Sequence, residues 1–387
     1  RGDVAEGCAP VWNGRSFDWK AWDERFGPLL DGSAFSDLPR AGVPIEAFYL
    51  PLFENWPVPM EGNYNGDYWA DRAFPDSYRA TFVEASRQFA EHMNDRGYDQ
   101  TLLEFYLNGK NNFKQNGWSR GTCPWLLDEP ANFQDYWALH FYGAAFHEGV
   151  NQAEGPAKLV FRCDISRPQW QRDVLDDVLD VNVVGGAFRK YRRMVLDRKR
   201  SAGQVVIEYG GSNPLEESNV QPLAWSVDSW SLGSDGVLPW QTVGNAQSWT
   251  NGDALSLFYP AVQDQPGPVP SVRLKAYRRG QQDVEYLTLL AKVQDQPRWA
   301  VGKRVQEALS SEGRSTGSGF AGGEDAGIVR YGRLTPQDFW ALRTRVAKAL
   351  SEAAPQPENR LVEFRLPRRT PKALESRLVK SIISARD

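Results

Sequence analysis

Two adjacent carboxylates, Asp128 and Glu129, stand at the end of the short apolar segment Cys123–Pro130. Two neighbouring acids at one place are candidates for proton-transfer chemistry. Like charges repel, and burial penalises both ions, so such a pair is costly if it serves structure alone. A structural alternative stays open, in which Asp128 caps the following helix and Glu129 pairs with a basic residue.

The segment around the pair predicts how the two acids are positioned. The apolar run Cys123–Leu127 is typical of a buried strand. Pro130 ends that strand, because proline lacks an N–H and keeps the preceding residue out of the helical region. Asn132 and the stretch Phe133–Phe146 predict a helix directly afterwards. The pair would then lie at the carboxyl end of a strand, where α/β barrels hold their chemistry.

Strands and helices are predicted to alternate over most of the chain. One clear amphipathic helix covers residues 76–97. The alternation predicts parallel βαβ units and an α/β fold, a (β/α)8 TIM-type barrel. Since a closed barrel needs eight strands, the first is expected near the N-terminus, unrecognised, or upstream of Arg1. The seven predicted strands cover residues 45–52, 101–107, 123–130, 158–165, 181–184, 204–209 and 223–230.

The barrel is expected to occupy residues 1–300, and its last helix residues 271–297, with an interruption at Gly280. Residues 301–353 are predicted to form a helical C-terminal extension with a Gly/Ser-rich loop. That loop contains the letters of a GxGxxG motif at 317–322, which we reject as a dinucleotide site because no strand precedes it.

Residues 354–387 form a basic tail. We expect it to be a solvated extension that packs loosely on the barrel.

Composition excludes several classes of function. The 387 residues carry a net charge of −4, which gives no strong nucleic-acid footprint. The three widely spaced cysteines and three histidines show neither a disulfide framework nor metal-ligand spacing, so no metal is expected. No run is long enough to span a membrane, and no signal peptide is visible. Because the chain starts at Arg1, we expect a processed or truncated product.

Several segments resemble one group of carbohydrate-active proteins. Residues 270–287, together with the preceding Leu257–Pro260, resemble the C-terminal signature of DUF4091 proteins, here at about 240–292, although Ala261 replaces a usual glycine. The segment Trp125–Pro130 is similar to the catalytic strand of glycoside hydrolase family 123. That family's N-terminal β-sandwich is not visible, and residues 301–387 have no counterpart.

The resemblance implies a retaining exo-β-N-acetylgalactosaminidase. The 2-acetamido oxygen of the substrate itself attacks the anomeric carbon, so these enzymes differ from glycosidases with a protein nucleophile. Glu129 would be the general acid and then the base, and Asp128 would hold the acetamido N–H. A general acid must keep its proton near neutral pH, so its pKa must exceed the usual value of about 4.3. No cofactor is implied.

The remaining pocket residues are expectations with structural alternatives. Asn108 and Lys110 resemble the family's Asn-x-Lys and would bind sugar hydroxyls, or only shape their loop. Tyr209 would bind the acetamido carbonyl and Trp225 would stack on the ring, or both belong to the core. Three further candidates, which either bind sugar or serve structure, are Asp164, Asp228 and Trp230.

Two other functions stay open. A glycosidase for sugars without an acetamido group would need a separate carboxylate nucleophile, for which Asp164, Glu208 or Asp228 are candidates. A non-catalytic glycan-binding protein is the other, although it has little use for a proton donor. In each case the partner is an oligosaccharide or glycoconjugate, which favours a secreted or periplasmic location and leaves the oligomeric state open.

Overall fold

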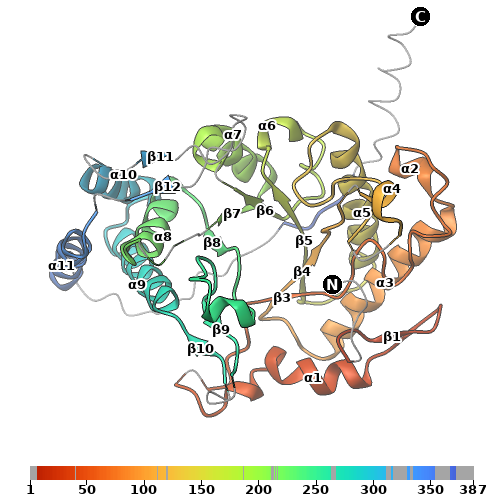
Figure 1. Ribbon diagram of the computed structural model, residues 1–387, viewed down its shortest axis with the longest axis horizontal. Helices are drawn as coiled ribbons and strands as arrows, with labels where there is room; N and C mark the ends of the chain where they lie inside the picture. Colours follow the sequence, from red (N-terminus) through yellow and green to blue (C-terminus); the bar gives the residue numbers. More distant parts are fainter. Residues whose placement is uncertain are drawn as a thin grey trace, which may run out of the picture.

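A computed structural model gives the architecture (Figure 1). It describes residues 7–353, apart from 40, 111, 119–120, 186, 211–212, 214, 216, 263–266, 311–314, 317–328 and 332–333, and it also describes 367–371.

The centre of the molecule is a six-stranded sheet in which all neighbouring strands are parallel and follow one another in chain order. The sheet curls into part of a barrel, with helices outside it (Figure 1). The predicted α/β fold of the (β/α)8 type is confirmed. The strands are β3 (Ala47–Tyr49), β4 (Leu102–Tyr106), β5 (Lys158–Ile165), β6 (Val181–Val184), β7 (Val205–Gly210) and β8 (Gly236–Pro239).

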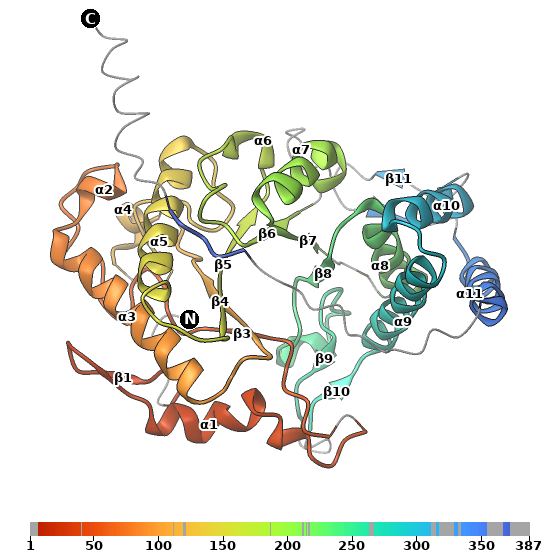
Figure 2. The ribbon, with the colours of Figure 1, turned by 180° about the vertical axis from the view of Figure 1, so that it is seen from behind.

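Helices connect these strands and cover the outside of the sheet, as Figure 2 shows from behind. The α3 helix agrees closely with its predicted range. The helices are α1 (Lys20–Leu30), α2 (Ala70–Ala73), α3 (Asp76–Asp95), α4 (Phe113–Asn116), α5 (Phe133–Val150), α6 (Pro168–Gln171), α7 (Ala187–Ala202), α8 (Val220–Leu232), α9 (Val272–Val293), α10 (Arg298–Ser310) and α11 (Pro336–Glu352), with 3-10 turns at Ser33–Phe35 and Ala246–Trp249.

Short two-stranded ribbons lie beside the main sheet. Near the N-terminus, β1 (Val11–Trp12) pairs antiparallel with β2 (Phe17–Asp18). The others pair β9 (Phe258–Tyr259) with β10 (Val269–Pro270), and β11 (Ser315–Thr316) with β12 (Val329–Arg330). No helix in the described part of the chain has the length and apolar character to cross a membrane.

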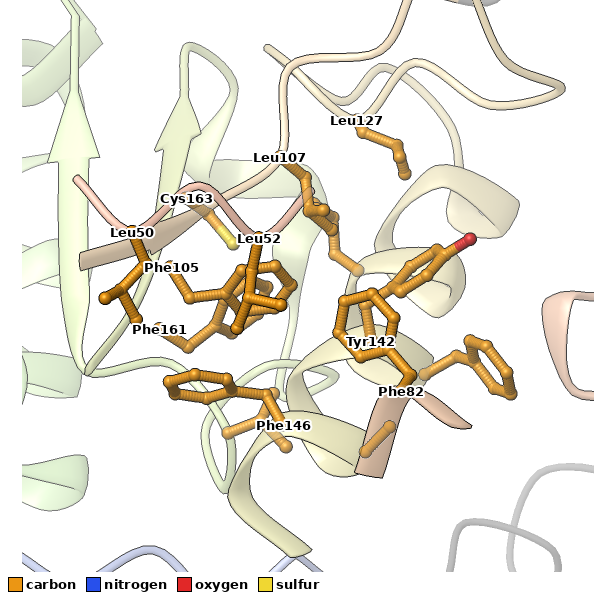
Figure 3. Packing of buried hydrophobic residues seen from close by; sticks show 14 of the residues in the cluster. Leu50, Leu52, Phe82, Phe105, Leu107, Leu127, Tyr142, Phe146, Phe161 and Cys163 are labelled. Atoms are coloured by element: carbon orange, nitrogen blue, oxygen red, sulfur yellow. The ribbon is translucent and has the colours of Figure 1, made fainter. Parts of the chain in front are cut away.

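Alternation along the strands separates an apolar outer face from a partly polar inner face. Phe105 of β4 and Phe161 of β5 are fully buried and pack with Phe82 and Phe146 from α3 and α5 (Figure 3). Successive side chains of a strand point to opposite faces. The neighbours of these phenylalanines, Tyr106 included, therefore point into the barrel.

A second hydrophobic cluster joins α8 and α9 to α10 and α11. Residues 301–353 thus share buried contacts with helices of the predicted barrel region. The α9 helix passes through Gly280 without the interruption that we predicted. A Cβ atom on Gly280 would lie 2.7 Å from the Ser226 side chain of α8, so the glycine permits close packing of the two helices.

Two predicted strands are wrong. Residues 123–130, which were predicted as a strand between β4 and β5, form turns and loop. The β4 strand therefore pairs directly with β5. Residues 223–230 belong to the α8 helix. Its apolar residues are buried over most of its circumference, so the helical period is weak. The strand that follows, β8, was missed.

Five residues of the predicted tail are described; Pro367, Arg368 and Thr370 are exposed as expected, whereas Arg369 is anchored in the barrel. The Arg369 side chain is only 6% exposed, and its Nε lies 2.7 Å from Asp180 Oδ1. The backbone carbonyl of Arg369 accepts a hydrogen bond of 2.6 Å from Asn151. The rest of the tail and the GxGxxG loop lie outside the described residues.

Candidate functional site

Polar side chains gather on the inner face of the sheet near the carboxyl ends of the strands. Register pairs Tyr106 of β4 with Arg162 of β5, and alternation places Asp164 on the same face as Arg162. Tyr49 of β3 reaches them, because its hydroxyl accepts a hydrogen bond from Arg162. Tyr209 of β7 belongs to this face too, since it groups with inner-face residues of neighbouring strands.

The loop after β4 carries the two acids to this face. Leu127 N donates to Gly109 O at 2.9 Å, and Glu129 N donates to Asp164 O at 3.1 Å. The loop is thus attached to the ends of both β4 and β5. Asp135, in the first turn of α5, accepts hydrogen bonds from the backbone N–H groups of Leu126, Ala131 and Asn132. The pair therefore reaches the carboxyl end of the sheet without the strand that we predicted.

Asp128 is held by two side chains from the same side of the sheet. Lys110 Nζ donates to its Oδ2 at 2.5 Å, and the Tyr106 hydroxyl donates to its Oδ1 at 3.2 Å. The Asp128 side chain is 20% exposed and the Lys110 side chain 44%. In the structural alternative, Asp128 would cap the following helix and Glu129 would pair with a basic residue. The structure instead has Asn132 as the cap of α5, and Asp128 forms an ion pair with Lys110.

Glu129 has a backbone conformation that side chains disfavour. Its φ is +60°, in the left-handed region, and proline follows it. A non-glycine residue there costs about 1–2 kcal/mol. The Arg167 guanidinium donates to the Glu129 carbonyl at 3.3 Å. Backbone strain of this kind is frequent at functional sites.

A buried network of charged side chains lies on the inner face of the sheet beside the acid pair. Arg162 is 4% exposed and forms ion pairs of 2.9 Å with Asp164 and 3.1 Å with Glu104. Its guanidinium also lies 4.7 Å from the centroid of the Tyr106 ring. Burial raises the pKa of Asp164; Arg162 opposes this shift, and the negative charge of Asp128 adds to it. The two aspartates therefore belong to one electrostatic unit.

Tyr209 connects the acids to an exposed tryptophan. Burial raises the pKa of Tyr209, and the charges of Glu129, Asp164 and Asp128 raise it further. Its ring centroid lies 5.5 Å from that of Trp240, which follows β8 and is 60% exposed. Trp240 is anchored because its backbone N–H donates to Gly210 O at 2.8 Å.

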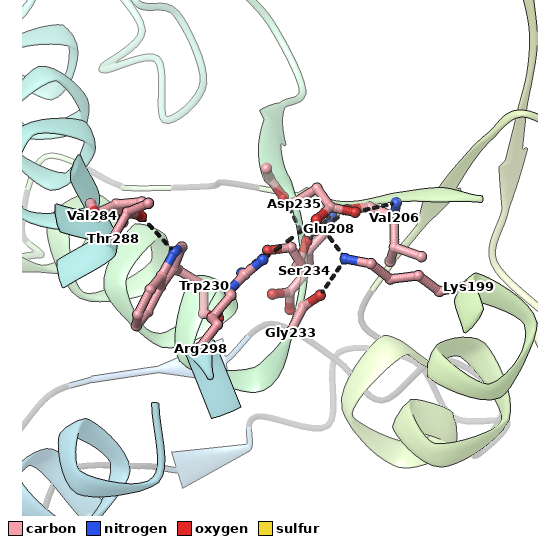
Figure 4. A network of polar contacts seen from close by, with 11 residues as sticks. Lys199, Val206, Glu208, Trp230, Gly233, Ser234, Asp235, Val284, Thr288 and Arg298 are labelled. Carbon is pink, nitrogen blue, oxygen red and sulfur yellow. Dashed lines mark hydrogen bonds and ion pairs between the residues drawn. The ribbon is translucent and has the colours of Figure 1, made fainter. Parts of the chain in front are cut away.

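Three predicted substrate-binding residues lie elsewhere. Trp225 and Trp230 are each 6% exposed on α8, and Trp230 donates to Thr288 of α9 (Figure 4). Asp228 is 1% exposed and pairs with Arg189 of α7 at 2.6 Å. The two tryptophans pack between outer helices, and Asp228 also accepts a hydrogen bond from Tyr331, so all three belong to the outer helical layer and not to the acid pair.

Glu208 belongs to the same outer layer. It neighbours Tyr209 on β7 and therefore points to the opposite face, where Ser229 of α8 donates to its carboxylate. Glu208 and Asp228 thus do not face the acids, whereas Asp164 does. Asn108 follows β4 and is half-buried beside the loop.

Sequence reasoning missed four residues of the inner face, namely Tyr49, Glu104, Tyr106 and Arg162. For Glu104, Tyr106 and Arg162 the signal was the alternation of polar and apolar residues within β4 and β5, which indicates one polar face; Tyr49 lies on the three-residue strand β3, where no such alternation can be seen. Among the described residues, no three His, Cys, Asp or Glu side chains are grouped to hold a metal ion. The arrangement offers proton transfer from carboxyl groups, with neutral and cationic donors beside them.

Comparison with known proteins gives structural likenesses only. No protein-family model and no curated protein sequence matches this chain. A family 123 glycoside hydrolase from Clostridium perfringens, described for glycolipid glycan hydrolysis, is similar at 13% identity and TM-score 0.42, over 72% of this chain and 44% of that one. A GH10 xylanase from Bispora sp. MEY-1 is similar at 10% identity and TM-score 0.38, over 68% and 82%. Neither likeness assigns this chain to a family.

Proposed function

We propose that this chain is a glycoside hydrolase in which Glu129 donates a proton to the glycosidic oxygen. The observation that supports the proposal is the convergence of Glu129, Asp128 and Asp164 at the carboxyl end of the sheet. Tyr106 and Tyr209 add hydroxyl groups there. The resemblance of residues 125–130 to family 123 points to the same acids.

Asp128 and Glu129 have different surroundings, as their different proposed roles in catalysis require. Lys110 and Tyr106 hold Asp128 in one orientation and compensate its charge. A fixed carboxylate of this kind suits the role of accepting the acetamido N–H. Glu129 is attached to the end of β5 through its backbone N–H, and in the proposed mechanism it has the role of the general acid. Proper positioning converts the attack by the acetamido oxygen into an intramolecular step, worth several kcal/mol.

The finer proposal is a retaining exo-β-N-acetylhexosaminidase of the N-acetylgalactosamine type. Asp128 orients the acetamido group, whose oxygen attacks the anomeric carbon while Glu129 protonates the leaving oxygen. The carbon–oxygen bond to the leaving group breaks and an oxazolinium forms. Glu129, now ionised, takes a proton from water, which opens that intermediate. The sugar keeps its anomeric configuration.

A second mechanism is favoured by one observation, the place of Asp164. If the substrate has no acetamido group, Asp164 is the candidate nucleophile, since Glu208 and Asp228 face the outer helices. Its ion pair with Arg162 favours the ionised form against the effect of burial, which raises its pKa, and the proposed role of Asp128 would then change.

Glu129→Gln tests the proposed function. The amide cannot donate a proton as an acid does, so turnover should fall about 10²–10⁴-fold. Saccharide binding should survive, because Gln has the same shape. Glu307→Gln on the outer helix α10 is a matched control, because it makes the same chemical change at a 64%-exposed side chain outside the site. A protein that binds glycans but shows no turnover before or after the substitution would overturn the proposal in favour of a lectin.

A further inference from the structure

A cavity of about 260 Å³ lies between the segments that carry the acid pair and α4. It is smaller than the roughly 300–1,000 Å³ of pockets for drug-sized ligands, which suits a single sugar residue. Its lining residues are Tyr68, Phe113, Lys114, Pro124, Trp125, Asn132, Gln134 and Asp135.

The cavity belongs to the same loop as the acids. Trp125 and Asn132 line it on either side of Asp128 and Glu129 in the sequence. Each lining residue is three positions from its nearer acid in the sequence, and three residues span at most about 11 Å. A saccharide with one residue at the acid pair therefore has its next residue within reach of the cavity.

The walls combine aromatic and amide groups. Tyr68 is 50% exposed, and its backbone carbonyl accepts a hydrogen bond of 2.8 Å from the Trp125 indole, which fixes the wall. Phe113 is supported by Tyr64 at 5.7 Å between centroids. Asn132 and Gln134 offer amide groups that donate to and accept from hydroxyls. Aromatic faces beside amides suit sugars, which have both apolar C–H faces and hydroxyl rims.

The charged residues that line the cavity are Lys114 and Asp135, and Asp135 is only 2% exposed. Asp135 is committed to three backbone N–H groups, and burial raises its pKa. Lys114 Nζ donates to the Tyr68 hydroxyl at 2.8 Å and lies 5.0 Å from the Tyr68 ring centroid. Among the residues that the structure describes, Lys114 forms no ion pair. An ammonium beside a hydroxyl donor suits a carboxylate or sulfate.

We propose that this cavity is a subsite for an acidic sugar, a uronic acid or sulfated residue, on the leaving-group side of the substrate. Lys114 binds the acidic group, Tyr68 supports the ring, and Gln134 binds hydroxyls. The assignment to the leaving-group side rests on the proposed function, whereas the affinity for an acidic sugar does not.

The test compares binding of methyl glucuronide and methyl glucoside, followed by saturation-transfer NMR, which needs no turnover. Wild type should bind the glucuronide about tenfold more tightly, because a charge-assisted hydrogen bond is gained. Lys114→Ala should remove this preference. Glu129→Gln should retain it, as should the control Lys303→Ala, which removes a 73%-exposed lysine on α10.

The outcomes separate this proposal from the proposed function. Equal binding of the two glycosides, no binding of either, or a preference that survives Lys114→Ala overturns the subsite, even if the enzyme hydrolyses glycosides. A preference that depends on Lys114 in a chain without glycosidase activity supports the acidic-sugar site and overturns only the proposed function.

Discussion

At the scale of residues, the site depends on charges that the fold brings together from separate strands. Arg162 lies between Glu104 and Asp164; the charge of Asp128 raises the pKa of Asp164, and the charge of Asp164 raises the pKa of Tyr209. A buried cation between two carboxylates compensates both. If one partner is removed, the others stay buried without compensation, which is far more costly than loss of a surface pair.

Arg162→Met should therefore lower the free energy of unfolding by about 3–5 kcal/mol in urea titrations near pH 7. The loss should shrink at acidic pH. Burial already raises the pKa of Asp164, and without Arg162 the protonated form is favoured further, so stability is lost as pH rises through the raised pKa.

The matched control is Arg193→Met, because the Arg193 side chain is 98% exposed, and it should change stability by about 0.5 kcal/mol at most. Adding Glu104→Gln and Asp164→Asn to Arg162→Met should restore part of the loss. Equal effects of the two arginine substitutions would show that the inner-face network does not stabilise the fold.

At the scale of elements, the acid pair reaches its place through a loop and not a strand. Local pattern located the pair, the helix after it and the carboxyl end of the sheet, because Pro130 and the Asn132 cap are local signals. The local pattern wrongly predicted a strand where residues 123–130 form a loop. The loop is fixed by hydrogen bonds from Leu127 to Gly109 and from Glu129 to Asp164, which join distant parts of the chain. Whether an apolar run pairs as a strand is decided by such contacts.

The same limit explains why Trp225, Asp228 and Trp230 were placed in the pocket. A strand over residues 223–230 would present them at its end, but the segment is the α8 helix. Its burial against α9 on one side and the sheet on another removes the amphipathic signal. Five of the six strands were predicted from the sequence, whereas β8 and the packing of α8 were not.

Close packing of α8 and α9 gives a prediction at this scale. Gly280→Ala places a Cβ 2.7 Å from the Ser226 side chain, so the helices must move apart. The expected loss is about 1–3 kcal/mol of unfolding free energy. Ser226→Gly in the same chain should recover part of it, although the Leu223 backbone is also close. A fully tolerated Gly280→Ala, in thermal and urea unfolding, would contradict this packing.

At the scale of the molecule, the chain returns from the outer helices to the amino-terminal end of the sheet. Arg369 reaches Asp180 before β6 and donates to the carbonyl of Ala202 before β7 at 2.5 Å. His147 of α5 also contacts Asp180, at 3.0 Å. This end lies opposite the acid pair, so the segment 367–371 supports stability without taking part in the site.

Arg369→Met should lower the free energy of unfolding by about 3 kcal/mol, because Asp180 is left buried with less compensation. The substitution should leave the carboxyl end of the sheet, where the acid pair lies, unchanged. The kcat on any substrate should therefore stay within about twofold of the wild-type value. Arg368→Met is the neighbouring control; its side chain is exposed and, among the residues that the structure describes, bonds to Asn151, so about 1 kcal/mol is expected. Equal losses for the two variants would show that the Asp180 contact is not the anchor.

The central claim is that Glu129 acts as an acid on a sugar that supplies its own acetamido nucleophile. The most direct measurement compares hydrolysis of p-nitrophenyl β-N-acetylgalactosaminide and p-nitrophenyl β-galactoside by wild type and Glu129→Gln. The account predicts cleavage of the acetamido sugar alone, lost in the variant. Cleavage of the plain galactoside would contradict the substrate-assisted mechanism and direct attention to Asp164, and cleavage that persists in Glu129→Gln would contradict the role of Glu129.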